Sequence, residues 1–197
     1  DENFSLQPLT DYSKYKAKCE KILNNFGSDD FVVTTIRPAT VCGYGARQRL
    51  DVVVNILSNL AFHNRKITVF GGSQLRPNIH IKDMVNVYIK LITAPKNKIN
   101  FQIFNAGGKN QTVMQLAKDV KKVIGKDVQI LKLHSDDKRS YHISSKKIFK
   151  VLGFKTKYTV KNAAKDLKQA FSKKLLVKPL SNKSYFNIKT MQSINLK

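Results

Sequence analysis

Tyr12 and Lys16 form a Tyr-x-x-x-Lys unit near the start of the chain, directly after the segment Pro8-Leu-Thr-Asp11. Residues four positions apart lie on one face of a helix, so the phenol and the ammonium can interact. A lysine charge beside a tyrosine hydroxyl favours the tyrosinate, which lets the phenol exchange protons closer to neutral pH. The pair is therefore a candidate general acid/base.

Spacing alone does not establish this chemistry. Lys and Arg make up 36 of the 197 residues and there are seven tyrosines. About one such pair is therefore expected by chance, given the basic share of an ordinary protein. Tyr185 and Lys189 form a second pair near the end of the chain, which we interpret as coincidental. Whether Tyr12 and Lys16 are a catalytic pair or a coincidence therefore depends on the sequence around them.

The surrounding segments alternate between helical and strand patterns, which is typical of an α/β architecture. Gly27 is expected to end the first helix, Asp51 to cap the second, and Thr112 with Gln115 to form a capping box. The segment from Ser172 onward is lysine-rich and is expected to be a loop. The predicted helices are 13–26, 51–62, 83–92, 112–124, 145–152 and 160–171, and the predicted strands are 31–37, 67–70, 101–104 and 128–133.

Charge, hydropathy and cysteine content limit which ligands and which cellular locations are expected. A formal charge of +23 favours an anionic partner, but the lysines are spread along the chain with few interleaved aromatics, so nucleic acid is not the expected ligand. No apolar run is long enough to cross a membrane, and the chain opens without a signal peptide. Cys19 and Cys42 form neither a disulfide framework nor a metal cluster. A cytoplasmic location with reduced cysteines is expected.

Several further segments carry recognisable motifs in a fixed order after the Tyr-x-x-x-Lys unit. They are Thr35-Ile-Arg-Pro-Ala-Thr-Val-Cys-Gly-Tyr-Gly45, Arg49–Asn55, Ile67–Asp83 with its Arg76-Pro-Asn-Ile-His80, Phe104-Asn-Ala-Gly-Gly108, Asp137-Lys-Arg139-Ser-Tyr141, Leu152-Gly-Phe154 and Tyr158-Thr-Val160. Their order and spacing resemble the extended short-chain dehydrogenase/reductase family of NAD-dependent nucleotide-sugar epimerases and dehydratases. The resemblance implies the C-terminal part of a Rossmann-type doubly wound sheet plus a smaller α/β substrate-binding domain.

The resemblance implies a role for each matching residue. Tyr12 would be the catalytic acid/base, and Lys16 would hold the nicotinamide ribose of NAD or NADP and lower the Tyr12 pKa. Pro38 and Ala39 would lie against the nicotinamide, and Thr40 would lie near the sugar. The remaining substrate-binding residues would be Asn55, Arg76 and Arg139 at the nucleoside diphosphate and Val69 and Phe70 at the base. A guanidinium suits a phosphate because its paired donors match the oxygens.

The chain also departs from the family pattern. Thr40 stands where many relatives have asparagine, and Cys42 replaces the tyrosine before the glycine. Thr10 is too close to Tyr12 to be the family's catalytic Ser/Thr. The glycine-rich dinucleotide fingerprint is absent, since Gly43-x-Gly45 follows the wrong strand and position 48 is Gln.

We therefore expect the chain to be the C-terminal portion of a larger enzyme that converts a nucleoside-diphosphate sugar through a keto-sugar intermediate, and to be inactive alone. A non-catalytic remnant that binds a nucleotide-sugar or nucleic acid is the alternative. A homodimer is expected only by analogy. The expected divisions are 1–48 (end of the Rossmann domain), 49–76 (substrate-binding segment), 77–107 (return to the Rossmann domain), 108–175 (substrate-binding domain) and 176–197 (tail).

Overall fold

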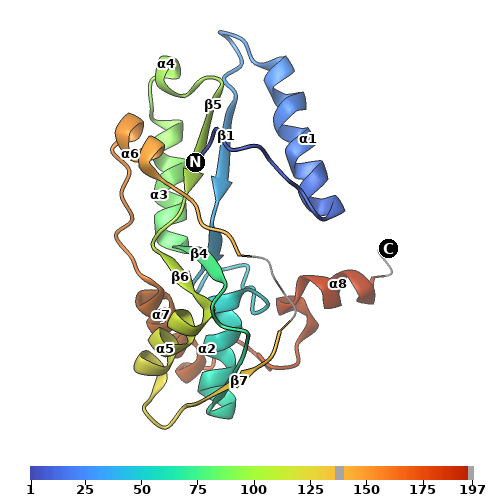
Figure 1. Ribbon diagram of the computed structural model, residues 1–197, viewed down its shortest axis with the longest axis vertical. Helices are drawn as coiled ribbons and strands as arrows, with labels where there is room; N and C mark the ends of the chain where they lie inside the picture. Colours follow the sequence, from blue (N-terminus) through green and yellow to red (C-terminus); the bar gives the residue numbers. More distant parts are fainter. Residues whose placement is uncertain (136–139, 195–197) are drawn as a thin grey trace.

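The computed structural model describes residues 1–135 and 140–194, in which strands and helices alternate along the chain (Figure 1). Parallel strand pairs predominate, and such pairs need long crossover connections, which the helices supply. The strands of the described part are β1 (Thr34–Pro38), β2 (Thr40–Cys42), β3 (Lys66–Phe70), β4 (Leu75–His80), β5 (Gln102–Ala106), β6 (Asn110–Thr112) and β7 (Gln129–Leu133).

Most helices begin and end where the sequence predicts. Gly27 follows the last residue of the first helix, and Thr112 and Gln115 form the predicted capping box. The helices of the described part are α1 (Asp11–Phe26), α2 (Val53–Asn64), α3 (Ile81–Ile92), α4 (Lys96–Ile99), α5 (Val113–Ile124), α6 (Lys146–Leu152), α7 (Val160–Ser172), the 3-10 turn η1 (Lys183–Tyr185) and α8 (Asn187–Ser193). None of them is long and apolar enough to span a bilayer.

The upper unit in Figure 1 is built on β1 and β5, which pair in parallel with Ile36 opposite Phe104. Helices α1 and α3 lie on either side of this pair, as in an open α/β sheet (Figure 1). Phe104 is fully buried because the β-branched and aromatic side chains of the strands pack against α3 and α6. The buried core of this unit consists of Ala39, Ile79, Met84, Val87, Leu91, Ile99, Phe104, Ala106, Ile148 and Phe154.

The lower unit packs α2, α5 and α7 against one another and beside the parallel pair β3–β7. Ile67 lies opposite Ile130 in that pair. Its core draws on the apolar faces of all three helices, and it consists of Cys42, Val54, Leu57, Ala61, Ile67, Val69, Leu116, Ala117, Val120, Ile124, Val128, Val160, Ala163 and Ala164.

A third sheet, β2–β4–β6, joins the two units. β4 pairs in parallel with β2, where Ile79 lies opposite Val41, and antiparallel with β6, where Arg76 lies opposite Gln111. β2 continues directly from β1, and α3 continues directly from β4. This sheet therefore fixes the upper unit to the lower one and places the end of β1 and the start of β4 near the junction.

Two predictions of local structure are wrong. Val52, not Asp51, occupies the cap position of α2. The Asp51 carboxylate instead accepts hydrogen bonds from Arg49 Nε and from the main-chain N–H of Asn187, both at 2.9 Å. Burial raises the pKa of Asp51, but these two donors outweigh it and hold the pKa below its ordinary value. The Asn187 bond also helps to hold the tail, which forms α8 where a loop was predicted.

Candidate active site

Tyr12 and Lys16 lie in the first turns of α1, on one face of the helix, as their spacing predicts. Thr10 begins the helix: its Oγ1 accepts from the Ser13 N–H at 3.3 Å, and its own N–H donates to Ser13 Oγ at 3.0 Å. Thr10 is thus committed to the cap. The Tyr12 side chain is 76% exposed and Lys16 is exposed, so the phenol and the ammonium are open to ligands.

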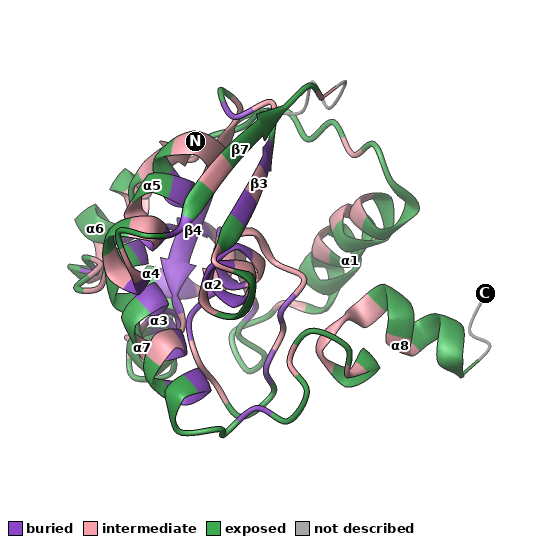
Figure 2. Ribbon diagram, turned by 90° about the horizontal axis from the view of Figure 1, so that it is seen from below, coloured by how far each residue is buried: buried purple, intermediate pink, exposed green. Residues whose placement is uncertain are grey.

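Helix α1 is attached to β1 by one ion pair. Arg37 donates from Nη2 to Glu20 Oε2 at 2.7 Å and from Nε to Oε1 at 3.0 Å, a two-point contact between partly buried groups. Within the described residues α1 has no buried side chain (Figure 2). The ion pair therefore helps to set the position of Tyr12 relative to the strand.

The residues that follow β1 lie at the junction of the two units. Figure 1 shows the N-terminal end of α1 and the C-terminal end of β1 at the same level of the molecule. Pro38 is exposed there, whereas Ala39 is buried and donates its N–H to the Ala106 carbonyl at 2.8 Å. Thr40 is half-buried at the start of β2. Pro38 is thus the accessible member of the predicted nicotinamide turn.

Asn55 is 3% exposed, and its amide is engaged within the chain. Its Oδ1 accepts from the Gly43 N–H at 3.0 Å, and its Nδ2 donates to the carbonyls of Arg49 at 2.8 Å and Gly43 at 3.3 Å. Gly43 has a φ of 108°, which favours glycine, so Asn55 holds a turn that only a flexible residue forms easily. Substrate contact by Asn55 stays a prediction.

Val69 and Phe70 are the last two residues of β3. Their side chains point to opposite faces of the sheet, because successive residues of a strand do so. Val69 is buried in the lower core, and the Phe70 ring is 57% exposed. Contact with a base stays a prediction for both, and Phe70 offers the accessible aromatic surface.

Arg76 lies in β4 beside a segment that returns from far along the chain. Its Nη1 donates to the Leu75 carbonyl at 2.9 Å, and its guanidinium carbon lies 5.5 Å from the centre of the Tyr141 ring. The Leu75 N–H donates to Ser140 Oγ at 3.0 Å, and the Tyr141 N–H donates to the Leu75 carbonyl at 3.4 Å. Arg139 lies outside the described residues, but its chain neighbour Ser140 contacts Leu75.

Sequence reasoning predicts no role for Tyr141 or Asp83, although both are central to the structure. Asp83 is fully buried and accepts main-chain N–H groups from Lys157 at 3.0 Å and Tyr158 at 2.9 Å, which ties α3 to the start of α7. Both residues lie in segments that match the family motifs, Asp83 at the end of the Ile-His-Ile-Lys-Asp83 run and Tyr141 two residues after Arg139.

His80, the last residue of β4, has a structural role. Its Nδ1 accepts from the Lys82 N–H at 3.1 Å and so caps α3. Because Nδ1 accepts, the ring proton is on Nε2, which lies 3.3 Å from Asp166 Oδ2 without the alignment of a hydrogen bond. The ring stacks on Tyr158 with centroids 4.8 Å apart, and burial lowers the His80 pKa.

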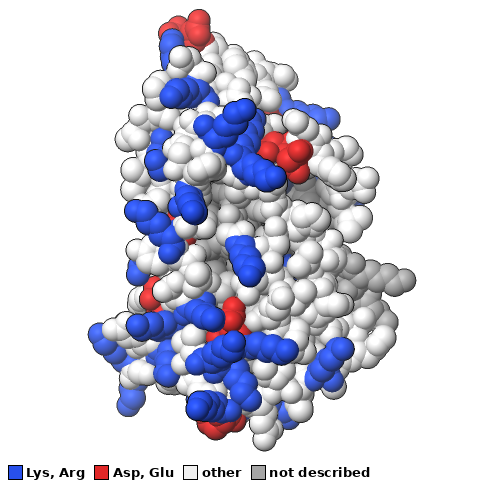
Figure 3. All heavy atoms as spheres, turned by 60° about the vertical axis from the view of Figure 1, so that its left-hand side comes forward, with Lys and Arg blue, Asp and Glu red and all other residues white. Residues whose placement is uncertain are grey.

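The chain is strongly basic, with a formal charge of +23. Figure 3 shows lysine and arginine spread over the face formed by α3, α5, α6 and α7, with few acidic side chains among them. A positive surface of this kind raises the local concentration of a negatively charged ligand. Among the described residues no group of His, Cys, Asp and Glu is arranged to hold a metal ion. Burial raises the pKa of Cys42 to about 12, with the Asp83 charge adding to it, so this thiol is inert.

Solved structures share this fold. The chain resembles RMD from Pseudomonas aeruginosa in complex with NADPH (TM-score 0.77, 16% identity, covering 88% of this chain and 60% of that one). It also resembles dTDP-glucose 4,6-dehydratase from Bacillus anthracis in complex with NAD (TM-score 0.75, 21% identity, 92% and 58%). A third is UDP-glucuronic acid 4-epimerase from Bacillus cereus in complex with UDP-glucuronic acid and NAD (TM-score 0.75, 22% identity, 89% and 56%).

These likenesses confirm the predicted fold class, a Rossmann-type α/β architecture. The chain spans about three fifths of the length of these structures. Residues 1–107, more than half of the chain, match the family profile described as the NAD dependent epimerase/dehydratase family. The match begins ahead of the Tyr-x-x-x-Lys helix and includes β4 and β5. The chain therefore belongs to the NAD-dependent epimerase/dehydratase family.

Proposed function

We propose that this chain is the C-terminal portion of an NAD(P)-dependent enzyme that epimerises or dehydrates a nucleoside-diphosphate sugar. The observation that carries the proposal is the joint placement of the Tyr12–Lys16 face and Arg76. The first lies on exposed helix α1 at the junction of the two units, and the second lies on β4, which joins those units. Acid/base groups and a phosphate-binding cation are the two components that such a reaction requires.

Tyr12 acts in this proposal as the general acid/base. It takes the proton of a sugar hydroxyl as that carbon is oxidised to a ketone, and it returns a proton when the ketone is reduced. The Lys16 ammonium, four residues further on, favours the phenolate form of Tyr12 and thereby assists proton transfer. Because both side chains are exposed in α1, no rearrangement of the core is needed for a substrate to reach them.

The nicotinamide end of NAD or NADP fits the residues present. Lys16 offers an exposed ammonium for the ribose hydroxyls, and the exposed Pro38 beside the buried Ala39 gives an apolar surface at the end of β1. The bound cofactor supplies acceptance and return of a hydride at the sugar carbon. No glycine-rich fingerprint is present in this sequence for the pyrophosphate, so we expect the 197-residue chain to bind NAD poorly and to turn over little substrate.

Substrate recognition in this proposal centres on Arg76 and Arg139, which pair with the two phosphates. Phe70 faces the base with its exposed ring, with Val69 behind it, and Thr40 lies toward the sugar. Arginine is suited to a diphosphate because its planar fork donates two hydrogen bonds to adjacent oxygens and stays charged. Asn55 acts through the Gly43 turn that it holds, or contacts the substrate if that turn opens.

The test is titration of the 197-residue chain with UDP, dTDP and GDP by calorimetry. We expect one of them to bind, and Arg76→Ala to weaken that binding by about tenfold or more, the usual effect of losing hydrogen bonds to a charged group. Lys118→Ala, a change on the exposed surface of α5, is the matched control and should leave binding unchanged.

Three results would contradict the proposal. One is an absence of binding to every nucleoside diphosphate. Another is steeply salt-dependent binding of DNA or RNA in place of nucleotides, which would favour a nucleic-acid function. The third is hydride transfer by the isolated chain with added NAD, which would show that the cofactor site is complete without further sequence.

A further inference from the structure

The Arg76 side chain lies against the ring of Tyr141, a residue far from it in the sequence. The guanidinium carbon is 5.5 Å from the ring centre, which is within the range of a cation–π contact. Tyr141 is 47% exposed, so one side of this pair is open to solvent. Such a contact takes up the face of the guanidinium and not its edge, where the N–H donors lie.

Two hydrogen bonds hold Ser140 and the main chain of Tyr141 against β4, beside Arg76. The Leu75 N–H donates to Ser140 Oγ at 3.0 Å, and the Tyr141 N–H donates to the Leu75 carbonyl at 3.4 Å. That same carbonyl accepts from Arg76 Nη1 at 2.9 Å. The Arg76 side chain and the Tyr141 main chain are therefore both hydrogen-bonded to the Leu75 carbonyl, which places the ring beside the guanidinium.

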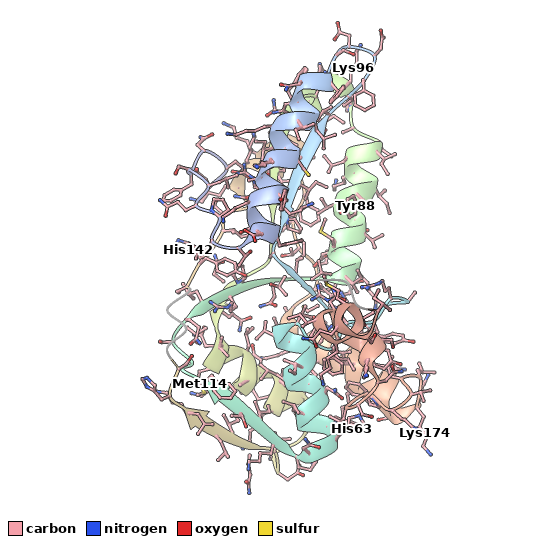
Figure 4. All side chains as sticks on the ribbon, turned by 90° about the vertical axis from the view of Figure 1, so that its right-hand side faces the viewer. His63, Tyr88, Lys96, Met114, His142 and Lys174 are labelled. Carbon is pink, nitrogen blue, oxygen red and sulfur yellow. The ribbon has the colours of Figure 1, made fainter. Side chains whose placement is uncertain are left out.

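The segment after Tyr141 is held equally well at the junction of the two units. Asn110 in β6 brackets Ile143, with its Nδ2 donating to the Ile143 carbonyl at 3.0 Å and its Oδ1 accepting from the Ile143 N–H at 3.1 Å. Ser145 Oγ accepts from the Gly107 N–H at 2.9 Å. Figure 4 shows His142 at the level where the two units meet, near the lower end of α1. Residues 140–145 thus form a strap across the β4–β6 pair.

The backbone of Arg76 is fixed from the other side. Arg76 pairs with Gln111 in the antiparallel ladder, and its carbonyl accepts from Asn78 Nδ2 at 2.8 Å. A long arginine side chain on a fixed backbone still has several rotamers, and ordering it for a ligand costs conformational entropy. A ring held beside it reduces the number of rotamers before the ligand arrives.

We infer that Tyr141 is a positioning residue for Arg76: it pre-orders the guanidinium for the diphosphate of the substrate through the strap at residues 140–145. This inference rests on the proposed function, since it assigns to Arg76 the phosphate contact proposed above. Tyr141 acts through Arg76 and not on the base. Its removal should therefore weaken binding of a free diphosphate as much as binding of a nucleotide.

The experiment is a double-mutant cycle on the full 197-residue chain, titrated with UDP and with inorganic pyrophosphate. Tyr141→Leu removes the ring but keeps the main-chain bonds, and it should weaken both ligands by about two- to fivefold, the usual range for an exposed cation–π contact. Tyr141→Phe keeps the ring and should bind both ligands as the wild type does. In a chain that already carries Arg76→Ala, Tyr141→Leu should have no further effect.

Tyr88→Leu on α3 is the matched control, because Tyr88 is 52% exposed and α3 carries none of the residues of the strap (Figure 4). It should leave both affinities unchanged. A circular-dichroism melt of each variant identifies any that fail to fold. If Tyr141→Leu is one of them, Tyr141→Phe still tests the inference. A phenylalanine that lowers the affinity fivefold would contradict a role for the face of the ring.

Several outcomes would overturn the inference while leaving the proposed function intact. Tyr141→Leu could bind both ligands normally while Arg76→Ala weakens them. It could weaken UDP but not pyrophosphate, which would mean that the ring stacks on the base. It could weaken binding equally with and without Arg76, which would mean that the two residues act separately. If the wild-type chain binds neither ligand, or Arg76→Ala has no effect, the phosphate role of Arg76 fails and the inference fails with it.

Discussion

Replacement of Asp83 by asparagine should destabilise the whole chain, because this one carboxylate holds α3 to the start of α7. The side chain is fully buried, and its oxygens accept the Lys157 N–H at 3.0 Å and the Tyr158 N–H at 2.9 Å. Hydrogen bonds to a charged group contribute about 1.5–3 kcal/mol each. Asparagine keeps one acceptor and turns an amide donor toward the other N–H, so at least one bond is lost and a buried donor is left unpaired.

The expected loss is about 3 kcal/mol from the free energy of unfolding, a large part of the 5–15 kcal/mol typical of a domain. With a urea dependence of about 2 kcal/mol per molar, the unfolding midpoint should fall by about 1.5 M. Circular dichroism during urea titration measures it. Asp119→Asn is the matched control, since that carboxylate is partly exposed and accepts from Gln111 Nε2 at 2.9 Å with Lys161 3.6 Å away.

The control should cost less, about 1 kcal/mol, because its ion-pair partner Lys161 is exposed and an asparagine oxygen can still accept from Gln111. The reasoning is wrong if Asp83→Asn unfolds within about 0.5 M urea of the wild type, for then the two main-chain donors find other partners as readily as they find the carboxylate. It is also wrong if both variants fall by the same amount, since burial would then not distinguish the two acids.

Two further predictions follow from the titration of buried groups. Because burial raises the pKa of Cys42 to about 12, a disulfide reagent should modify the exposed Cys19 in the native chain and Cys42 only after unfolding; two fast-reacting thiols would contradict this. Burial lowers the pKa of His80, so the unfolded chain binds a proton at this histidine more readily than the folded chain does. The free energy of unfolding should therefore be highest above pH 6.5, the ordinary histidine pKa, and should fall as the pH drops below that value. His80→Asn keeps an acceptor for the Lys82 N–H and should reduce this dependence, measured as urea midpoints at about pH 7.5 and 5.5; an unchanged slope would exclude His80 as its source.

Helix boundaries could be predicted from the sequence because caps are local. Thr112 and Gln115 are three residues apart, and their side chains satisfy each other's main-chain donors without help from the rest of the fold. Asp51 shows the limit of this reasoning. It has the right residue type for a cap, but Arg49 and the tail residue Asn187 provide stronger donors, and the helix begins after Val52. The second of those donors lies 136 residues away.

Burial could be predicted less well than helicity. The apolar residues of α1 recur at helical spacing, and the helix is present, yet Tyr15, Ile22 and Phe26 are all exposed. Periodicity identifies a face of a helix but not the element that covers it. The β4 strand shows the opposite case. No strand is predicted over residues 75–80, and Pro77 and Asn78 are residue types that disfavour strands, but the central position of β4 between β2 and β6 imposes the extended form.

The same distinction divides the candidate site into two parts. Tyr12 and Lys16 share a face because any helix places residues four apart together, so their relative placement could be predicted from spacing alone. The setting of Arg76 depends on Leu75 meeting Ser140 across 65 positions of sequence, and no local pattern contains that contact. In the proposed site, the acid/base pair is thus placed by local spacing, and the setting of the proposed phosphate contact depends on the strap. Changes in residues 140–145 should therefore alter the affinity for the diphosphate and leave the proton-transfer pair as it is.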